Sequence, residues 1–587
     1  MIKIFKYLTG KELLMALGSL FFIIFQVFME LTIPQLMAEI TTLIQTPDSS
    51  TMAIWRVGGL MILCALGSFA AAMCIGYFVA MIGARFSKRM RSELFNKVDS
   101  FSMEEVNNFS TDSLITRATN DITQVQMLVT MGFTVIVRAP IMAGWALTRI
   151  VGKGFLEWTI ATAITVSILL TVIAVIMILV TPKFRKMQVL IDNVNRVTRE
   201  NLTGLRVVRA YNAETYQEEK FDQANAELTN TQLFTGRTMA IMWPMLSLLM
   251  GGLTLVIYWI GAHLIEAAEM ADRLPLFASM VVFSNYGMQV IMSFMMLTMI
   301  FFILPRAIVS AKRINEVLDT DPAIVDGVKT EGLDGLKGIV TFKNVSFKYP
   351  NAAEYVLEDI NFTVNQGETI AFIGSTGSGK STLINLIPRF FDVTEGEISV
   401  NGVNIKDYTT ESLNNKIGYV SQRAVLFRGD VTSNVAFGSN GEKDYSEEDV
   451  KRAIAIAQGT DFVEAKEDGY KSEITQGGTN VSGGQKQRLA IARAICKEPE
   501  IYIFDDSFSA LDYKTDRILR SELKKETAGV TSIIVAQRIG TIMDADQIVV
   551  LDEGKIVGKG KHKELLQTCE VYKQIAMSQL SEEELAI

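Results

Sequence analysis

Long apolar runs, separated by polar stretches, fill the first half of the chain. Each is long enough to cross the ~30 Å hydrocarbon core of a bilayer as a helix of ~20 residues. There are six, at about residues 13–38, 57–83, 125–148, 156–181, 239–264 and 274–303. A buried helix of a soluble protein is the alternative for any single run, but six in succession favour membrane spans.

The positions of Lys and Arg between these runs predict their orientation. The stretch after the second run contains Arg85, Lys88 and Arg89, and the one after the fourth contains Lys183 and Arg185. Basic loops stay in the cytoplasm, which predicts a multi-pass protein with both termini in the cytoplasm. We expect the membrane to be the plasma membrane. Both basic loops are long, so we expect the helices to continue beyond the bilayer.

The second half of the chain has a different pattern, in which short β-like runs such as Gly338–Tyr349 alternate with helical ones. This pattern is typical of a soluble α/β domain. A polar, Gly-rich stretch precedes it. We therefore expect a transmembrane domain at 1–318, a linker at 319–337 and an α/β domain at 338–587.

Composition narrows the partners and the chemistry. Hydrophobic residues make up 49% of the chain, which fits a membrane protein. The net charge of −8 argues against nucleic acid as the main partner, because phosphate backbones require a basic surface. Four cysteines are too few for a disulfide framework.

A phosphate-binding loop is predicted where an apolar strand meets a helical pattern. "GSTGSGKST" matches G-x-x-x-x-G-K-[ST] in its required strand–loop–helix context. Backbone N–H groups of such a loop close on phosphate oxygens, its lysine reaches the β- and γ-phosphates, and the serine after it helps to hold Mg²⁺. The predicted ATP-binding residues are Gly374, Ser375, Thr376, Gly377, Ser378, Gly379, Lys380, Ser381 and Thr382.

A second phosphate-site element is the stretch "IYIFDD", in which a buried strand delivers Asp505 to the Mg²⁺. The alternative is that the two aspartates, Asp505 and Asp506, simply cap a turn.

Between these elements the chain reads "NVSGGQKQRLAIARAI". With this signature the chain resembles the ATP-binding cassette (ABC) transporters of the exporter type. The resemblance implies six transmembrane helices with long cytoplasmic extensions, fused to an α/β P-loop nucleotide-binding domain. It also implies that the signature contacts ATP bound to the opposite nucleotide-binding domain, through Val481, Ser482, Gly483, Gly484 and Gln485.

The resemblance extends to single positions. Tyr349 matches the aromatic residue that stacks on adenine, with an ordinary core tyrosine as the alternative. Gln422 matches the glutamine that senses Mg²⁺ and the γ-phosphate. Asp512 matches a loop that runs across the dimer interface. Phe109–Asp121 and Leu205–Glu214 match the bends that dock on nucleotide-binding domains.

Two positions depart from the family at one catalytic site. Asp506 stands where the family has a glutamate that polarises the attacking water, and Gln537 stands where it has a histidine. Aspartate is one methylene shorter, and a misplacement of ~1 Å can cost ~10²-fold in rate. Glutamine cannot carry a proton at neutral pH. A milder departure is Gln476–Gly477, where the family usually has Glu-Arg.

These departures predict that the site binds Mg-ATP and hydrolyses it poorly, while the intact signature completes a competent site on a partner. The expected partner is a second, non-identical half-transporter that carries the glutamate and the histidine. The alternative is a homodimer with two weak but working sites.

The substrate path is harder to predict. Glu30 and Arg138 lie within apolar spans, where a charge usually faces a cavity or a partner charge. Asn285 and Gln289 are spaced i, i+4 on the Met-rich sixth span, near Met292. These five residues are the cavity candidates, with helix packing and lipid contact as the alternative. We expect hydrophobic or amphipathic cargo; a lipid-like or peptide cargo, or a non-pumping ATP-gated protein, stays open.

Overall fold

The computed structural model describes residues 2–46, 49–152, 155–270, 272–350, 352–438, 440 and 445–580. Its contacts divide the chain into two compact units. The first consists of Met1–Asp99 and Thr111–Thr320, and the second of Ser100–Ser110 and Asp321–Ile587. Each is described by itself.

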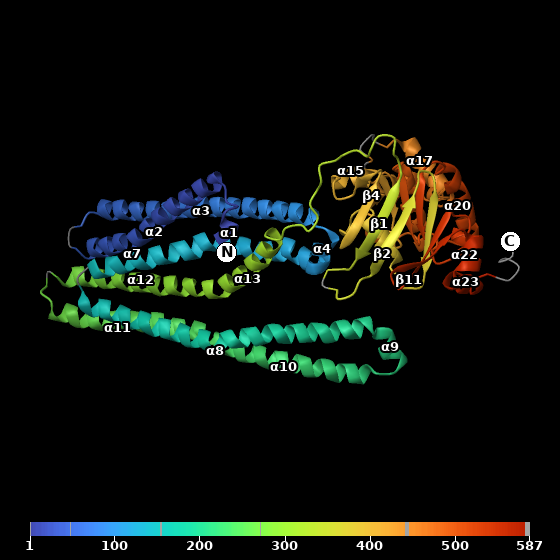
Figure 1. Ribbon diagram of the computed structural model, residues 1–587. Helices are drawn as coiled ribbons and strands as arrows, with labels where there is room; N and C mark the ends of the chain where they lie inside the picture. The colour runs from blue at the N-terminus through green and yellow to red at the C-terminus, as the bar shows by residue number, and fades with distance from the viewer. Residues whose placement is uncertain are drawn as a thin grey trace. The chain divides into compact units, whose positions relative to one another are not determined.

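The first unit is helical (Figure 1). Among the described residues, six continuous helical runs are long and apolar enough to cross a membrane, which confirms the predicted number. These runs are Gly10–Gln45, Thr51–Asp99, Thr111–Gly152, Leu156–Thr203, Glu214–Ala267 and Arg273–Leu318. The elements of the unit are α1 (Ile2–Phe5), α2 (Gly10–Gln45), α3 (Thr51–Asp99), α5 (Thr111–Thr116), the π-helical η1 (Arg117–Asp121), α6 (Ile122–Met131), the π-helical η2 (Gly132–Val137), α7 (Arg138–Gly152), α8 (Leu156–Thr203), α9 (Leu205–Ala210), α10 (Glu214–Ala240), α11 (Met242–Ala267), α12 (Arg273–Thr298) and α13 (Ile300–Leu318).

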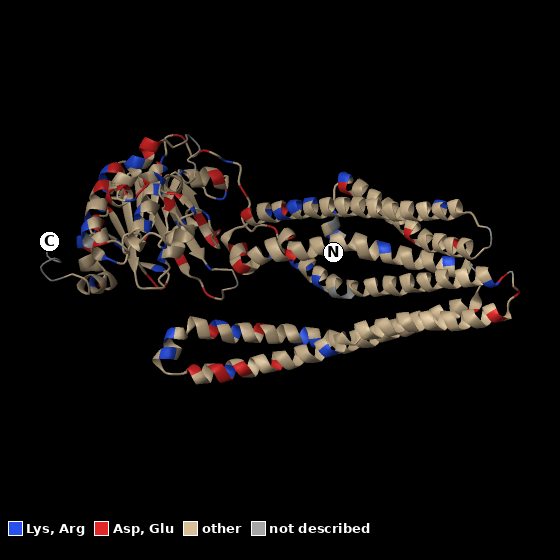
Figure 2. Cartoon of the chain, turned by 180° about the vertical axis from the view of Figure 1, so that it is seen from behind, with Lys and Arg blue, Asp and Glu red and all other residues tan. Residues whose placement is uncertain are grey.

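The helices extend beyond the predicted spans. At 1.5 Å per residue, the 48 residues of α8 reach roughly 70 Å, more than twice the hydrocarbon thickness. The polar end of α8 lies beside α10, and the short α9 joins them (Figure 1). Lys220 of α10 forms an ion pair with Glu200 of α8 at 3.0 Å. Figure 2 shows charged residues gathered on this end and sparse along the apolar parts of the long helices.

Aromatic residues of α8 and α12 form the centre of this unit. Trp158, Phe283 and Tyr286 are fully buried there. The Tyr286 hydroxyl donates a hydrogen bond to Leu31 O of α2 at 2.8 Å. Pro34 interrupts hydrogen bonding of that same turn of α2, because proline has no N–H. Tyr286 therefore supplies a polar contact where the helix is weakened.

The second unit contains three sheets among its described residues (Figure 1). Four strands pair in the order β2-β1-β4-β5, six in the order β12-β11-β3-β10-β9-β6, and β7 pairs with β8. The strands are β1 (Val340–Phe347), β2 (Leu357–Val364), β3 (Thr369–Gly374), β4 (Glu395–Val400), β5 (Val403–Asn404), β6 (Ile417–Val420), β7 (Gly429–Asp430), β8 (Glu473–Ile474), β9 (Ile501–Asp505), β10 (Thr531–Val535), β11 (Gln547–Asp552) and β12 (Lys555–Gly560).

Helices cover the sheets of this unit. They are α4 (Met103–Phe109), α14 (Lys380–Leu386), α15 (Thr410–Asn415), α16 (Val431–Val435), α17 (Glu447–Ile456), α18 (Thr460–Glu464), the 3₁₀ turns η3 (Gly469–Lys471) and η4 (Gln476–Gly478), α19 (Gly483–Cys496), α20 (Tyr513–Glu526), α21 (Ile539–Ile542), α22 (His562–Thr568) and α23 (Glu570–Met577). The combination of six apolar helical runs with an α/β domain confirms the predicted fold class.

The short helix α4 comes from the stretch between the second and third apolar runs, yet it belongs to the second unit. The buried Glu105 accepts a hydrogen bond from Ala323 N at 2.9 Å and closes a capping box with Ser102. Its last residue, Phe109, is the first residue of the expected docking segment Phe109–Asp121, and the helix ends there because the chain turns at Ser110, whose φ is 61°. From Thr111 onward the chain is part of the first unit.

Parallel pairing determines where the site lies. Strands β11, β3, β10, β9 and β6 are parallel neighbours, so their carboxyl ends share one edge of the sheet. Ligands of open α/β sheets bind beyond that edge. The phosphate loop follows β3, Gln537 follows β10, Asp506 follows β9 and Gln422 follows β6. Residues separated by up to 163 positions therefore converge.

Candidate functional site

The phosphate loop connects β3 to α14 and contains the predicted residues Gly374 to Thr382. Gly379 has φ +94°, and a Cβ there would lie 2.7 Å from the Leu357 side chain. The Lys380 ammonium donates to Gly374 O at 3.0 Å and to Ser375 O at 2.7 Å. Burial lowers the pKa of Lys380, and the carboxylates of Asp505 and Asp506 oppose that shift. The loop thus curls around a partly desolvated cation, which suits a phosphate.

Other side chains of the loop have separate partners. Ser378 is buried, and its hydroxyl accepts from Lys380 at 3.2 Å. The Ser375 hydroxyl donates to Asp552 at 3.4 Å. Thr376 and Gly377 lie exposed at the tip of the loop. The buried Thr382 is 3.0 Å from the Tyr349 hydroxyl.

Two oxygen ligands face each other beside the loop. The Ser381 hydroxyl donates to Asp505 Oδ1 at 3.0 Å. Asp505 ends β9 and is 5% exposed. Burial raises the pKa of Asp505, and the Asp506 charge adds to this, while the Ser381 hydrogen bond and Lys380 oppose it.

This pair suits Mg²⁺, which prefers hard oxygen ligands and keeps several of its ligands from water and phosphate. Within the described parts of the chain, no group of three or more His, Cys, Asp or Glu could hold a metal ion. A cation at this edge would therefore draw on Ser381, on Asp505, on the amide of the neighbouring Gln422 and on the phosphate that it neutralises.

Asp506 is the centre of what we call the hydrolytic end of the site, after the role that the resemblance implies for Asp506 and Gln537. It has φ 45° and is 9% exposed. Gln537 Nε2 donates to Asp506 Oδ2 at 2.8 Å, and Gln422 Nε2 reaches the same oxygen at 3.3 Å. Burial raises the pKa of Asp506, while the hydrogen bond from Gln422 lowers it. The structure thus brings together the two residues that depart from the family pattern, and they are the donor and the acceptor of one hydrogen bond.

Tyr349 lies beside the start of α14, half-buried. Its ring packs edge-to-face against Phe347 at 5.0 Å and Phe391 at 5.3 Å between centroids. With its hydroxyl near Thr382, the ring is fixed next to the phosphate loop. This position suits a nucleobase platform and equally a tyrosine of the domain core.

The signature residues form the first turn of α19. Ser482 is its N-cap: its hydroxyl accepts from Gln485 N at 3.3 Å, and Gln485 Oε1 accepts from Ser482 N at 3.0 Å. Val481 is buried, and Gly483 and Gly484 begin the helix. The Gln485 side chain is therefore engaged in its own turn, which leaves the glycine N–H groups and the serine O–H to meet an anion.

Asp512 occupies a similar N-cap position, on α20, where it accepts from Thr515 N at 3.0 Å. The hydrogen bonds from Thr515 lower the pKa of Asp512. Its carboxylate therefore caps a helix of its own chain.

In the helical unit the structure pairs the two charges of the apolar spans. Arg138 Nη2 lies 2.9 Å from both carboxylate oxygens of Glu30. Glu30 also accepts from Gln26 at 2.9 Å and from Ser68 at 3.2 Å. This network joins α2, α3 and α7. Sequence reasoning missed Gln26, which the i, i+4 spacing from Glu30 could have indicated, and Ser68, for which the sequence has no signal.

The other cavity candidates lie on α12. Asn285 Nδ2 donates to Val281 O of its own helix at 2.9 Å. The Gln289 side-chain oxygen is buried and has no hydrogen-bond partner among the described residues. Met292 is 43% exposed. The structure does not bring these three to the Glu30–Arg138 network through any described hydrogen bond.

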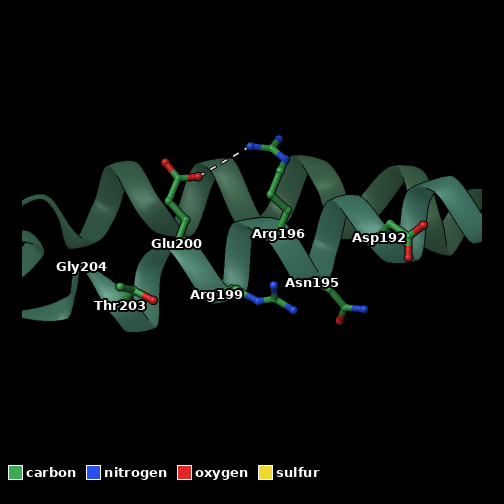
Figure 3. Close-up of a pocket in the computed structure, with 7 residues that line it drawn as sticks. All are labelled: Asp192, Asn195, Arg196, Arg199, Glu200, Thr203 and Gly204. Atoms are coloured by element: carbon green, nitrogen blue, oxygen red, sulfur yellow. Dashed lines mark ion pairs between the residues drawn. The ribbon is translucent and has the colours of Figure 1, made fainter. Parts of the chain in front are cut away.

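A groove of about 790 Å³ lies along the polar end of α8. Figure 3 shows that Arg196 points toward Glu200, with which it forms an ion pair at 3.7 Å, and that Arg199 and Asn195 lie below them in the view. Asp192, Thr203 and Gly204 complete the lining. Its charged walls differ from those expected for an apolar cargo.

Comparison with known proteins agrees with both halves. Residues 357–509 match the family described as ABC transporter, and residues 16–294 match the ABC transporter transmembrane region. The chain is 41% identical, over 89% of its length and 88% of the relative, to an uncharacterised ABC transporter ATP-binding protein of Mycobacterium bovis. It is 31% identical, over 92% of its length and 89% of the relative, to an ATP-dependent lipid A-core flippase of Hahella chejuensis.

A similar solved structure is that of a bacterial Atm1-family ABC exporter with ATP bound. The TM-score is 0.74 at 23% identity, and the alignment covers 97% of this chain and all of the other. At this identity the likeness shows the fold.

Proposed function

Because the chain belongs to the ABC transporters, as an exporter half-transporter with a transmembrane region and a nucleotide-binding domain, we propose that it is one half of a heterodimeric exporter. Its own site binds Mg-ATP and hydrolyses it slowly, and its signature completes the catalytic site of the partner. ATP binding closes the nucleotide-binding domains, and hydrolysis at the other site resets them.

The observation that carries this proposal is the hydrogen bond from Gln537 Nε2 to Asp506 Oδ2, at 2.8 Å. A general base must have an oxygen within reach of the water whose proton it takes. Here the Oδ2 atom of Asp506, whose side chain is already one methylene shorter than that of glutamate, accepts hydrogen bonds from the amides of Gln537 and Gln422. Neither amide can take or give a proton at neutral pH.

Nucleotide binding draws on the other residues of the same edge. The loop N–H groups and Lys380 hold the phosphates, and Ser381 and Asp505, with the Gln422 amide oxygen, hold Mg²⁺. The bound metal neutralises phosphate charge. The ring of Tyr349 stacks on the adenine of ATP. These groups are all present, so binding survives where hydrolysis is weakened.

The turn around α9, which we call the α8–α10 tip, favours the proposal of a second subunit. Val207 and Tyr211, in and after α9, are 61% and 79% exposed, and Leu202 just before it is 66% exposed. Exposed apolar side chains gathered at one tip are typical of an interaction surface. We propose that this tip, within the expected docking segment Leu205–Glu214, contacts the nucleotide-binding domain of the partner.

The cargo is hydrophobic or amphipathic in this proposal, and export is across the plasma membrane with both nucleotide-binding domains in the cytoplasm. The resemblance to lipid A-core flippases favours a second candidate, a homodimer that moves a lipid-like molecule. In that case the same site would have to hydrolyse ATP in both copies.

ATP turnover separates the two candidates. The full-length chain is purified alone and together with a candidate partner, a half-transporter that carries the glutamate and the histidine, and phosphate release is measured. The proposal expects slow release alone, fast release from the pair, and loss of turnover when only the Walker B glutamate of the partner is changed to Gln. Fast release by this chain alone would contradict the heterodimer and support the homodimeric flippase.

A further inference from the structure

The segment that carries Gln537 leaves the sheet and needs another support. Strand β10 ends at Val535, and Ala536 N makes a further sheet bond, to Phe372 O at 3.2 Å. Gln537 and Arg538 are exposed. Ile539 then begins α21, a helix of four residues whose first N–H groups have no partner within the helix.

The Gln579 side chain, just beyond α23, supplies that support from both of its amide atoms. Its Nε2 donates to Gln537 O at 2.8 Å, and its Oε1 accepts from Ile539 N at 2.8 Å. The two bonds bracket the Gln537–Arg538–Ile539 backbone as a neighbouring strand would. One side chain thus satisfies an acceptor and a donor that the end of the strand leaves behind.

We call the two hydrogen bonds of Gln579 the clamp. The helix that precedes Gln579, α23, is anchored by buried side chains. Tyr572 and Ala576 of α23 are fully buried in one apolar cluster with Ala536 and Ile539. The Tyr572 hydroxyl lies 2.7 Å from His562 Nδ1 of α22. The C-terminal helices pack on the same unit as the sheet (Figure 1), so α23, which ends two residues before the exposed Gln579, is anchored in the core.

We propose that Gln579 is a positioning residue that holds the Gln537 backbone so that the Gln537 amide meets Asp506. The proposal deepens the function proposed above and rests on its assignment of Gln537 and Asp506 to the ATP site. The C-terminal helices thereby become part of the machinery that retains ATP.

The test measures how long the full-length protein retains ATP. Protein loaded with radiolabelled Mg-ATP is separated from free nucleotide, and the half-life of the bound ATP is recorded. We expect Gln579→Met to shorten that half-life about threefold, as for loss of a hydrogen bond of ordinary strength. Gln574→Met is the matched control, because its amide lies on α23 and reaches Glu570 of the same helix, at 3.5 Å.

Coupling to Gln537 distinguishes positioning from a general structural role. In a Gln537→Ala background, Gln579→Met should have no further effect, because the side chain that it positions is gone. An equal shortening in both backgrounds would overturn the proposal, as would a half-life unchanged from wild type. If Gln579→Met does not fold, Gln579→Glu replaces it: it keeps the acceptor for Ile539 N and loses the donor to Gln537 O, and the same shortening is expected.

The function proposed above can fail separately. In that case the wild-type chain alone releases phosphate rapidly instead of retaining ATP. The same variants are then ranked by phosphate release, and the proposal still requires a rate that differs from wild type for Gln579→Met, no change for Gln574→Met, and no added effect in the Gln537→Ala background.

Discussion

The binding end and the hydrolytic end of the nucleotide site lie on one edge of one sheet, and they differ in what their side chains are free to do. At the binding end, Lys380, Ser381 and Asp505 are held by short contacts in a geometry that suits phosphate and Mg²⁺. At the hydrolytic end, the Gln537 amide donates to Oδ2 of Asp506, the carboxylate that the proposed function assigns to the attacking water. Under the function proposed above, this difference would separate affinity for ATP from its hydrolysis through two residues that follow the neighbouring strands β9 and β10.

The largest expected effect tests the binding end. Lys380→Met should weaken ATP binding by about 100-fold, because it removes the only side-chain cation of the phosphate loop "GSTGSGKST". Binding of a fluorescent ATP analogue measures it. Lys343→Met, on the exposed face of β1, is the control and should leave the affinity unchanged. Undiminished binding by Lys380→Met would show that the loop does not hold phosphate.

The next effect tests the hydrolytic end. The pair Asp506→Glu and Gln537→His should raise phosphate release at this site by about 10²-fold, since both the reach of the base and the protonatable partner are restored. ATP affinity should stay within about twofold, because the binding groups are untouched. Asp506→Glu alone is the control. A double variant no faster than wild type would mean that another part of the site limits turnover.

A smaller effect tests the helical unit. Arg138→Met leaves Glu30 without its cation and should lower Tm by about 1–2 °C, in line with about 1 kcal/mol for a polar contact inside a membrane protein. Adding Glu30→Gln should recover part of the loss. ATP binding should be unchanged in both variants. Equal Tm values for wild type and Arg138→Met would indicate that the ion pair contributes no stability.

The smallest effect concerns pH. The folded pKa of Asp505 is raised, mainly by burial, so its ionised form is costly at neutral pH, and this cost vanishes as pH falls below the unfolded pKa. Asp505→Asn should therefore raise the Tm of nucleotide-free protein slightly at pH 7, and the gain should shrink toward acidic pH. Asp512, whose folded pKa is lowered, is the control, and Asp512→Asn should give no such gain. A gain for Asp505→Asn that grows on acidification would contradict the burial argument.

The sequence predicted much of this architecture because its signals are local. Runs of apolar residues long enough to cross a bilayer announce helices without reference to the rest of the chain, and six were confirmed. The same holds for "GSTGSGKST", in which glycines, a lysine and a hydroxyl must stand in order for backbone N–H groups to surround phosphate. The departures at Asp506 and Gln537 were visible for the same reason.

Other features had no local signal. Ser68 reaches Glu30 from a different helix, and Glu105 of α4 accepts a hydrogen bond from Ala323 N near the start of the α/β domain. Gln579 bonds a backbone segment 40 residues before it. Nothing in the spacing of such residues indicates that they meet, because the contacts depend on how helices and strands pack.

The sequence by itself thus determined the apolar helices, the α/β domain, the phosphate loop and the two altered residues, since each is encoded by residue types at short spacing. Only the tertiary structure decided that Gln537 donates to Asp506, that Glu30 pairs with Arg138, and that Gln579 holds the backbone of Gln537. The physical reason is that parallel strand pairing and helix packing bring distant side chains to within a hydrogen bond of each other, and such distances exist only in the folded chain.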